Sequence, residues 1–232
     1  MRFKNKVDNC TAVFEFVHRQ QGGYRAFNNG DKVVFYYRTS LQSLGGEYTV
    51  DSAVDDIVNK TVTVKFTEKL PPEIENRYKN QSNVVAENIT YSPSVEISNC
   101  RFNAIPTRGI LVTARGKIRI HDNEFTNVAM ANVFISNDAN DWYESGPVRD
   151  VEIYNNKFIV TENNLPKSID CSAILVQPIT FGGKVTAPVH KNIYVHSNYF
   201  DVRRDRVITA YGVENLRTED NEYKNISTVK IN

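Results

Sequence analysis

The residues best suited to chemistry lie in one polar stretch, residues 137–147. It holds three carboxylates, Asp138, Asp141 and Glu144, beside Trp142, the only tryptophan of the chain. Hydrolysis of a glycosidic bond needs one carboxylic acid to protonate the leaving oxygen and one carboxylate to activate water. An exposed aromatic ring can pack against the apolar face of a sugar. The stretch therefore fits a sugar site, but it equally fits a compact loop whose tryptophan is an anchor and whose acids cap turns.

Other side chains of reactive type give weaker signals. Arg108 and Arg115 flank an apolar segment and could donate to a sugar hydroxyl or carboxylate, although a surface arginine is usually just solvated. The adjacent Asp55 and Asp56 are best explained as turn residues. The four histidines lack metal-ligand spacing, and the chain has no nucleophile elbow, phosphate-binding loop or dinucleotide fingerprint. We therefore expect no metal site and no cofactor.

A repeated segment indicates the fold that must position these residues. Each copy begins with an apolar–x–apolar alternation and closes on an aromatic residue, and four of the five copies have an Asn two positions before that aromatic residue. The closing aromatics are separated by 23, 33, 42 and 23 residues, so a coil of about 23 residues carries two insertions. A fixed coil length with insertions on chosen coils is typical of solenoids. The copies are residues 95–102, 118–125, 151–158, 193–200 and 216–223.

Aligning the copies produces columns of matching residues. One column holds Asn in four copies and Cys100 in the first, which predicts a ladder of stacked amides. The closing column is entirely aromatic, which predicts stacked rings, and two outward columns mostly alternate acidic and basic residues. An antiparallel sandwich would explain neither the constant Asn nor the charge columns. We therefore predict an all-β protein built around a right-handed parallel β-helix.

The N-terminal region lacks this repeat. Alternating segments at residues 11–17, 32–37 and 61–66 predict strands, and the Asn28–Asp31 run is a strong turn signal. We predict that residues 1–72 form a small β-barrel-like module, inserted between coils of the full protein, and that residues 73–232 form the β-helix. On this prediction the chain begins within a longer protein.

Composition narrows the possible partners. The 232 residues carry a formal net charge of +1, so no basic field points to nucleic acid. The apolar runs are too short to span a bilayer, and no apolar segment follows the basic N-terminus as in a signal peptide. The three cysteines are far apart, odd in number and without CxxC spacing, which favours small buried thiols over a disulfide framework or a zinc site. The oligomeric state stays open.

Several strings resemble one family of carbohydrate-active β-helix enzymes. The most specific is NDANDWYESGPVRD at residues 137–150, preceded by RGILVT at 108–113 and IRIHDNEF at 118–125. Residues 86–93 and 18–24 add to the match, the latter resembling a small barrel of that family. On these motifs the chain resembles the C-terminal part of the β-helix α-1,3-galactosidases, glycoside hydrolase family 110.

The resemblance implies a metal-independent, inverting enzyme, secreted or periplasmic, that removes terminal galactose from a galactose-terminated oligosaccharide or glycan. It also implies catalytic carboxylates, including an adjacent Asp-Asp pair, on a coil before the barrel, and residues 1–10 do not match that motif. We therefore expect this chain to lack the acid and base and to be inactive alone. The substrate-binding or loop-shaping residues implied are Asp138, Asn140, Trp142 and Glu144, with Arg108 as a further candidate.

Three functional hypotheses follow. The first is part of a glycosidase that hydrolyses terminal α-1,3-linked galactosides with two carboxylates. The second is a non-catalytic carbohydrate-binding or scaffold β-helix that uses the same sugar-binding surface without an acid and a base. The third, a pectin-degrading β-helix enzyme, would need an outward cluster of Asp residues on adjacent strands, which the columns do not supply.

Overall fold

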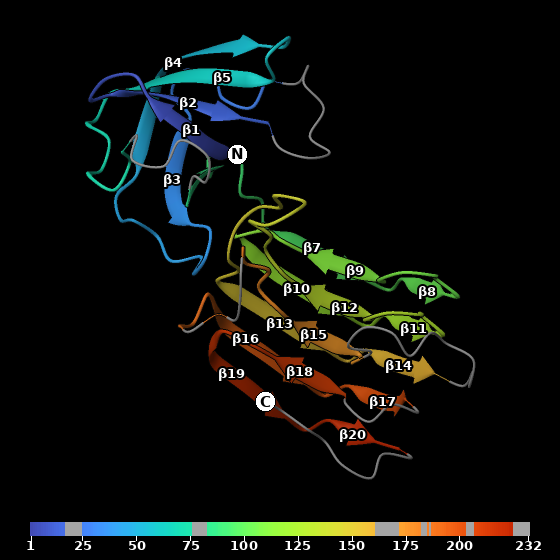
Figure 1. Ribbon diagram of the computed structural model, residues 1–232. Coiled ribbons are helices and arrows are strands. Elements are labelled where there is room, and N and C mark those ends of the chain that lie inside the picture. The colour runs from blue at the N-terminus through green and yellow to red at the C-terminus, as the bar shows by residue number, and fades with distance from the viewer. Residues whose placement is uncertain are drawn as a thin grey trace. The chain divides into compact units, whose positions relative to one another are not determined.

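The computed structural model describes residues 1–16, 25–75, 83–160, 172–181, 185, 187–202 and 207–224. Every regular element in these ranges is a β-strand, and no helix long and apolar enough to cross a membrane is found among them. The chain divides into two compact units (Figure 1). The first comprises Met1–Ser92, Asp138–Ser145 and Ile179–Val185, and the second comprises Pro93–Asn137, Gly146–Pro178 and Thr186–Asn232.

The first unit contains a closed antiparallel barrel in the strand order β1-β2-β5-β4-β3-β6. Stacked and edge-on contacts among Phe14, Phe35 and Phe66, all at most 1% exposed, fill its centre. The barrel runs beyond residue 72, because β6 pairs with both β1 and β3. Its strands are β1 (Arg2–Lys6), β2 (Thr11–Glu15), β3 (Lys32–Tyr37), β4 (Tyr48–Asp56), β5 (Thr61–Phe66) and β6 (Val84–Asn88).

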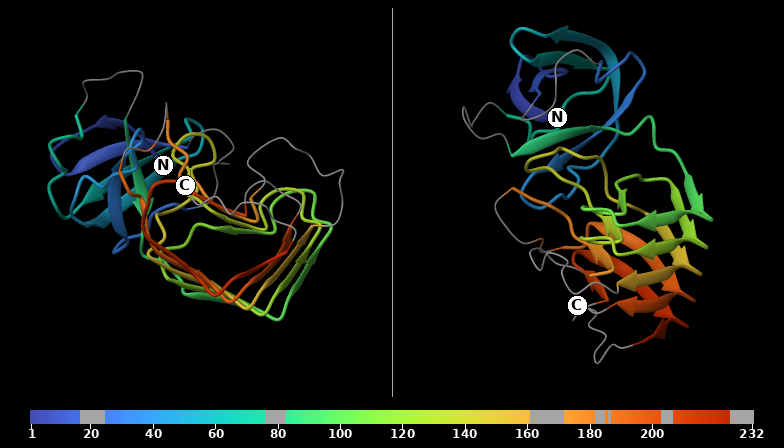
Figure 2. Two further views of the ribbon diagram at one scale, coloured as in Figure 1. Left: turned by 90° about the horizontal axis from the view of Figure 1, so that it is seen from below. Right: turned by 90° about the vertical axis from the view of Figure 1, so that its right-hand side faces the viewer.

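The second unit is a β-helix, as the repeat predicts. Each of the first four coils contributes one strand to each of three parallel sheets, and the described part of the fifth coil contributes a strand to two of them; seen along the stack, the coils superpose (Figure 2, left). The first sheet is β7 (Val95–Ser98), β10 (Lys117–His121), β13 (Asp150–Tyr154), β16 (His190–His196) and β19 (Val213–Glu219). The second is β8 (Arg101–Asn103), β11 (Glu124–Thr126), β14 (Lys157–Val160), β17 (Tyr199–Val202) and β20 (Glu222–Tyr223). The third is β9 (Ile110–Val112), β12 (Val133–Ile135), β15 (Ile174–Val176) and β18 (Ile208–Ala210).

The predicted amide ladder is confirmed at the turn between the first two sheets. Asn156 Nδ2 donates to Asn198 Oδ1 at 3.0 Å, and Asn123 Nδ2 donates to Asn156 Oδ1 at 3.0 Å. At the first coil, where Cys100 replaces Asn, only the backbone N–H of Cys100 joins the ladder. The residue before each ladder position has a φ between 51° and 56°, a conformation that Asn and Asp tolerate better than most residues. These positions are Asn99, Asp122, Asn155, Ser197 and Asp220.

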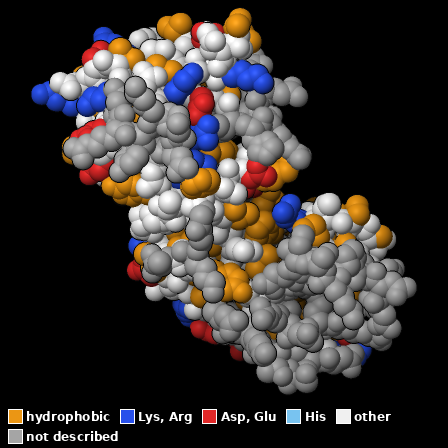
Figure 3. All heavy atoms as spheres, in the orientation of Figure 1, with side chains coloured by type: hydrophobic (Ala, Val, Ile, Leu, Met, Phe, Trp, Pro, Cys, Tyr) orange, Lys and Arg blue, Asp and Glu red, His pale blue; other side chains and the backbone are white. Residues whose placement is uncertain are grey.

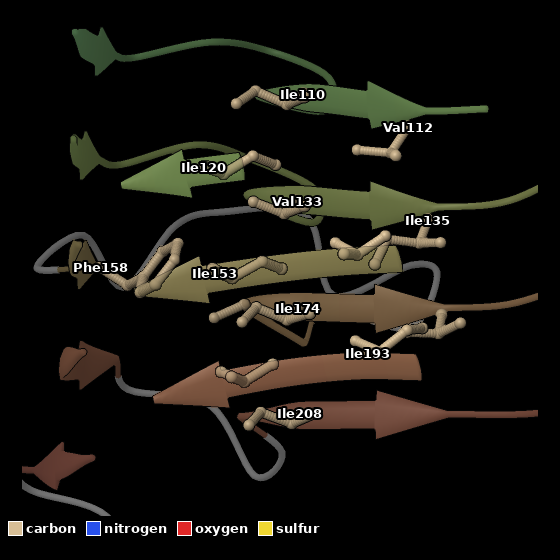
Figure 4. Packing of buried hydrophobic residues seen from close by; sticks show 14 of the residues in the cluster. Ile110, Val112, Ile120, Val133, Ile135, Ile153, Phe158, Ile174, Ile193 and Ile208 are labelled. Carbon is tan, nitrogen blue, oxygen red and sulfur yellow. The ribbon is translucent and has the colours of Figure 1, made fainter. Parts of the chain in front are cut away.

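The predicted ring stack is also confirmed and borders the core of the β-helix. The ring centroids of Phe125, Phe158 and Phe200 follow one another at 5.0 and 4.8 Å, and all three rings are fully buried. Isoleucines and valines from the first and third sheets point toward one another beside this stack (Figure 4). The apolar alternation of each repeat therefore fixes which residues face inward.

The outward columns pair across strands in the predicted register. Arg119 on β10 lies opposite Glu152 on β13, and Arg119 Nε contacts Glu152 Oε2 at 2.7 Å.

On the barrel face shown in Figure 3, charges of both signs are interspersed, in keeping with the near-neutral net charge.

Candidate functional site

The loop Asp138–Ser145, which belongs to the first unit, is closed by hydrogen bonds at its base. Asp138 is only 3% exposed, and its Oδ1 accepts the backbone N–H groups of Asn140 at 2.6 Å and Asp141 at 2.8 Å. Its own N–H donates to the carbonyl oxygen of Glu144 at 3.2 Å. A carboxylate that accepts two local amides fixes the start of a turn. Asp138 therefore shapes the loop from inside.

The tip of the loop presents different groups to solvent. Asn140 is exposed and Trp142 is 49% exposed, whereas Tyr143 and Glu144 are half-buried. Burial raises the pKa of the Tyr143 hydroxyl, so this side chain stays neutral near pH 7. A half-exposed indole beside an exposed amide offers an apolar surface and hydrogen-bonding atoms, the two elements of sugar recognition.

Sequence analysis missed the residue that supports this loop, Arg38, which directly follows β3. Its side chain is buried, at 3% exposed, and its Nε donates to the carbonyl oxygen of Ala139 at 3.0 Å. Its guanidinium carbon lies 4.2 Å from the ring centroid of Phe181 and 5.7 Å from that of Tyr143. No local pattern could have revealed these contacts, because Arg38 and the loop are about a hundred residues apart.

The other arginine candidates lie in the second unit. Arg108 is exposed, and its guanidinium carbon lies 4.9 Å from the ring centroid of Phe134. Arg115 is partly buried; burial, together with the nearby charge of Arg149, lowers its pKa to about 10. The structure therefore assigns Arg108 and the loop to different compact units.

Several surface charges of the β-helix form ion pairs, such as Arg119 with Glu152 and Lys191 with Glu214. A shallow groove of about 280 Å³ crosses the first sheet, lined by Asp150 and Glu152, whose carboxylates contact Arg119 at 2.9 and 2.7 Å. His121 lies in a surface column as predicted, and hydrogen bonds to Asp122 and Glu96 raise its pKa. Within the described ranges, no group of three or more His, Cys, Asp or Glu residues could hold a metal ion.

Two further sequence predictions concern Asp56 and the cysteines. Asp56 ends β4, where its carboxylate accepts the N–H and the side-chain amide of Asn59, so it is a turn-stabilising residue as expected. Cys10 and Cys100 are free thiols, as expected, but the prediction that they are buried is wrong: Cys10 is only partly buried and Cys100 is exposed at the first coil, while Cys171 lies outside the described residues.

Comparison with known proteins agrees with this fold. Residues 11–77 match the family model for the GLAA-B beta-barrel domain II. About nine-tenths of the chain is similar to proteins named alpha-1,3-galactosidase A. Identity is 34% over 91% of the chain with that of Peterkaempfera griseoplana, covering 29% of the relative. Identity is 35% over 90% of the chain with the protein of Streptomyces avermitilis, and the match covers 32% of that relative. Identity is 33% over 93% of the chain with the protein of Bacteroides thetaiotaomicron, and the match covers 35% of that relative.

The chain therefore spans about a third of the length of the curated relatives it matches. The match to the barrel model lies within the antiparallel barrel of the first unit, and the similarity to the relatives continues through most of the β-helix. The resemblance seen in the sequence motifs is thus confirmed: about nine-tenths of the chain is similar to the C-terminal part of proteins named alpha-1,3-galactosidase A.

Proposed function

We propose that this relative of the α-1,3-galactosidases is part of a glycoside hydrolase that removes terminal α-1,3-linked galactose from glycans. The observation that carries the proposal is the similarity, at 33–35% identity over about nine-tenths of the chain, to proteins of that name. The half-exposed Trp142 on a well-held loop supports it, because an indole face suits the apolar face of galactose.

Within this proposal the reaction is an inverting hydrolysis by two carboxyl groups. One protonates the leaving oxygen, while the other activates a water on the opposite side of the sugar, at a separation of about 6.5–9.5 Å. Asp138 is poorly suited to either task, since its Oδ1 already accepts two loop amides. We therefore assign the acid and the base to residues outside this loop, in a longer enzyme of which this chain is one part.

The loop then serves substrate binding. Trp142 stacks on the sugar, the amide of Asn140 bonds to hydroxyl groups, and Glu144 accepts from them. Asp138 holds the loop in shape, and Arg108, in the second unit, is a weaker candidate for substrate binding.

A second candidate is a non-catalytic carbohydrate-binding or scaffold protein with the same loop. The structural use of the Asp138 carboxylate favours it, because the most buried acid of the loop is engaged by the loop itself. Both candidates bind the same galactose-terminated sugar, but only the glycoside hydrolase cleaves it.

One assay separates them. The chain, and the same chain extended upstream with the coding sequence that precedes it, are incubated with galactose-α-1,3-galactose, and released galactose is measured. Activity of the extended chain alone is the expected result. Release by the short chain would place the acid and base within residues 1–232. If neither releases galactose but both bind the disaccharide, the non-catalytic function is the correct one.

Trp142→Ala and Asn140→Ala test the binding roles. Each is expected to weaken disaccharide binding by about 1–3 kcal/mol, the size measured for removing a stacking ring or a hydrogen-bonding group. Tyr91→Ala, which removes another exposed aromatic ring of the first unit, is the control. Equal effects of all three variants would exclude a specific role for the loop.

A further inference from the structure

We infer that Arg38 is a positioning residue, through which the barrel sets the conformation of the loop Asp138–Ser145 and the orientation of Trp142. The structural part of this inference stands independently, while its consequence for galactose affinity rests on the proposed function. Every contact used in the argument lies within the first compact unit.

The backbone of Arg38 is fixed on both sides. Its N–H donates to the carbonyl oxygen of Asn83 at 2.8 Å, and its carbonyl oxygen accepts the N–H of Phe181 at 3.0 Å. Because Arg38 directly follows β3, the barrel determines where its side chain starts. A side chain anchored in this way can hold another segment in place.

The side chain of Arg38 reaches the loop through a directional hydrogen bond. Its Nε donates to the carbonyl oxygen of Ala139 at 3.0 Å, and Ala139 is itself only 3% exposed. The N–H of Ala139 donates to the carbonyl oxygen of Ile179 at 3.1 Å, so both sides of this peptide are held. The base of the loop is thus fixed to Arg38.

The guanidinium also contacts two aromatic rings, those of Phe181 at 4.2 Å and Tyr143 at 5.7 Å. A planar guanidinium can stack on a ring and donate in its own plane at the same time, which a lysine ammonium cannot do. Tyr143 directly follows Trp142, so the position of the tyrosine ring restricts the orientation of the indole.

The backbone of Tyr143 shows why such support is needed. Its φ is 54°, in the left-handed region that a bulky non-glycine residue adopts only when its surroundings compensate. The contact between Arg38 and the Tyr143 ring is one such compensation. The loop has a second attachment at its far end, where Ser145 Oγ donates to Glu87 Oε1 of β6 at 2.8 Å. That bond does not act on the strained residue.

The charge of the Arg38 guanidinium is consistent with its role as a fixed support of the loop. Burial and the charge of Arg2 lower the pKa of Arg38, while Tyr143, Glu15 and Asp138 act in the opposite direction. The guanidinium remains protonated, as arginine does throughout the accessible pH range. A buried cation held by a carbonyl oxygen and two aromatic rings is costly to move, which suits a fixed support.

The test uses Trp142, the only tryptophan, as an internal reporter. Time-resolved fluorescence anisotropy of the intact chain measures nanosecond motion of the indole. Arg38→Met is expected to increase the amplitude of fast motion, Arg38→Lys to restore little of the order, and Arg101→Met, which alters an exposed arginine on β8, to change nothing. The thermal unfolding midpoint is measured for each variant to report barrel integrity.

If Arg38→Met unfolds the barrel, Tyr143→Leu tests the same contact from the loop side. It removes the ring contacted by Arg38 without touching the barrel, and the same increase in indole motion is expected. Unchanged indole motion in a folded Arg38→Met variant, or in Tyr143→Leu, would overturn the inference.

Titration with galactose-α-1,3-galactose then separates this inference from the proposed function. Arg38→Met is expected to weaken affinity by about tenfold, as misplacing a binding group does. If the unmodified chain shows no binding while Arg38→Met still frees the indole, the proposed function fails and the positioning role stands. If the unmodified chain binds and Arg38→Met alters neither motion nor affinity, the positioning role fails alone.

Discussion

Substituting Asn156 by Ala should remove the central amide of the ladder and destabilise the β-helix. The side chain is 1% exposed, its Oδ1 accepts the N–H of Asn123 at 3.0 Å, and its Nδ2 donates to the carbonyl oxygen of Ile120 at 2.9 Å. A buried N–H left without its acceptor costs about 1–3 kcal/mol, and loss of a second hydrogen bond costs about 1 kcal/mol. We therefore expect Asn156→Ala to reduce the free energy of unfolding by about 3 kcal/mol.

The assay is urea unfolding followed by far-ultraviolet circular dichroism, with Trp142 fluorescence recorded in parallel. The tryptophan lies in the first unit and Asn156 in the second, so the two signals report different units. Loss of stability is expected in the dichroism signal. Cys100→Ala is the matched control, because Cys100 occupies the same column and contributes its backbone N–H, which alanine keeps.

The control should change stability by no more than about 0.5 kcal/mol, as for other exposed positions. Equal effects of Asn156→Ala and Cys100→Ala would refute the reasoning, because the ladder would then contribute nothing beyond its backbone bonds.

Three further predictions concern the second unit. Phe158→Ala should lower the free energy of unfolding by about 3–5 kcal/mol, because the ring is fully buried between two others, and urea unfolding will measure it. Gly109→Ala should lower the melting temperature, since its Cβ would lie 2.5 Å from the carbonyl oxygen of Asn132; an unchanged value contradicts this packing. Burial lowers the pKa of His190 to about 3, so stability should be full above pH 6.5 and fall toward pH 3, by up to about 1.4 kcal/mol per pH unit. His190→Gln should reduce this slope in denaturation curves recorded at successive pH values.

The β-helix was predictable because the sequence pattern that specifies each coil is short and recurs from coil to coil. Asn123, Asn156 and Asn198 recur at one position of each copy, and each repetition independently indicates the same turn. In each column a side chain lies next to a side chain of the same type in the following coil, so amides stack on amides and rings on rings.

The barrel was only partly predictable. Segments 32–37 and 61–66 became β3 and β5 with the expected bounds, since both have a clear apolar pattern. The strand β4 has no such pattern, and a bulge between Val50 and Ser52 shifts its register. The strand β6 is defined by pairing with β1 and β3, which are distant in sequence, so the module extends past the expected residue 72.

Within the candidate site, sequence located the loop but not its support. Asp138 and Trp142 stand out by residue type and spacing, whereas Arg38 resembles any arginine after a strand. Its importance comes from burial and from contacts about a hundred residues away. Whether the loop residues bind a sugar stays a prediction.

Binding of galactose-α-1,3-galactose to the intact chain, measured by isothermal titration calorimetry, tests the central claim most directly. We expect saturable binding that Trp142→Ala abolishes or strongly weakens and that the glucose epimer of the terminal sugar does not reproduce. Absence of binding, or equal binding of both epimers by the unmodified chain and the Trp142→Ala variant, would contradict it.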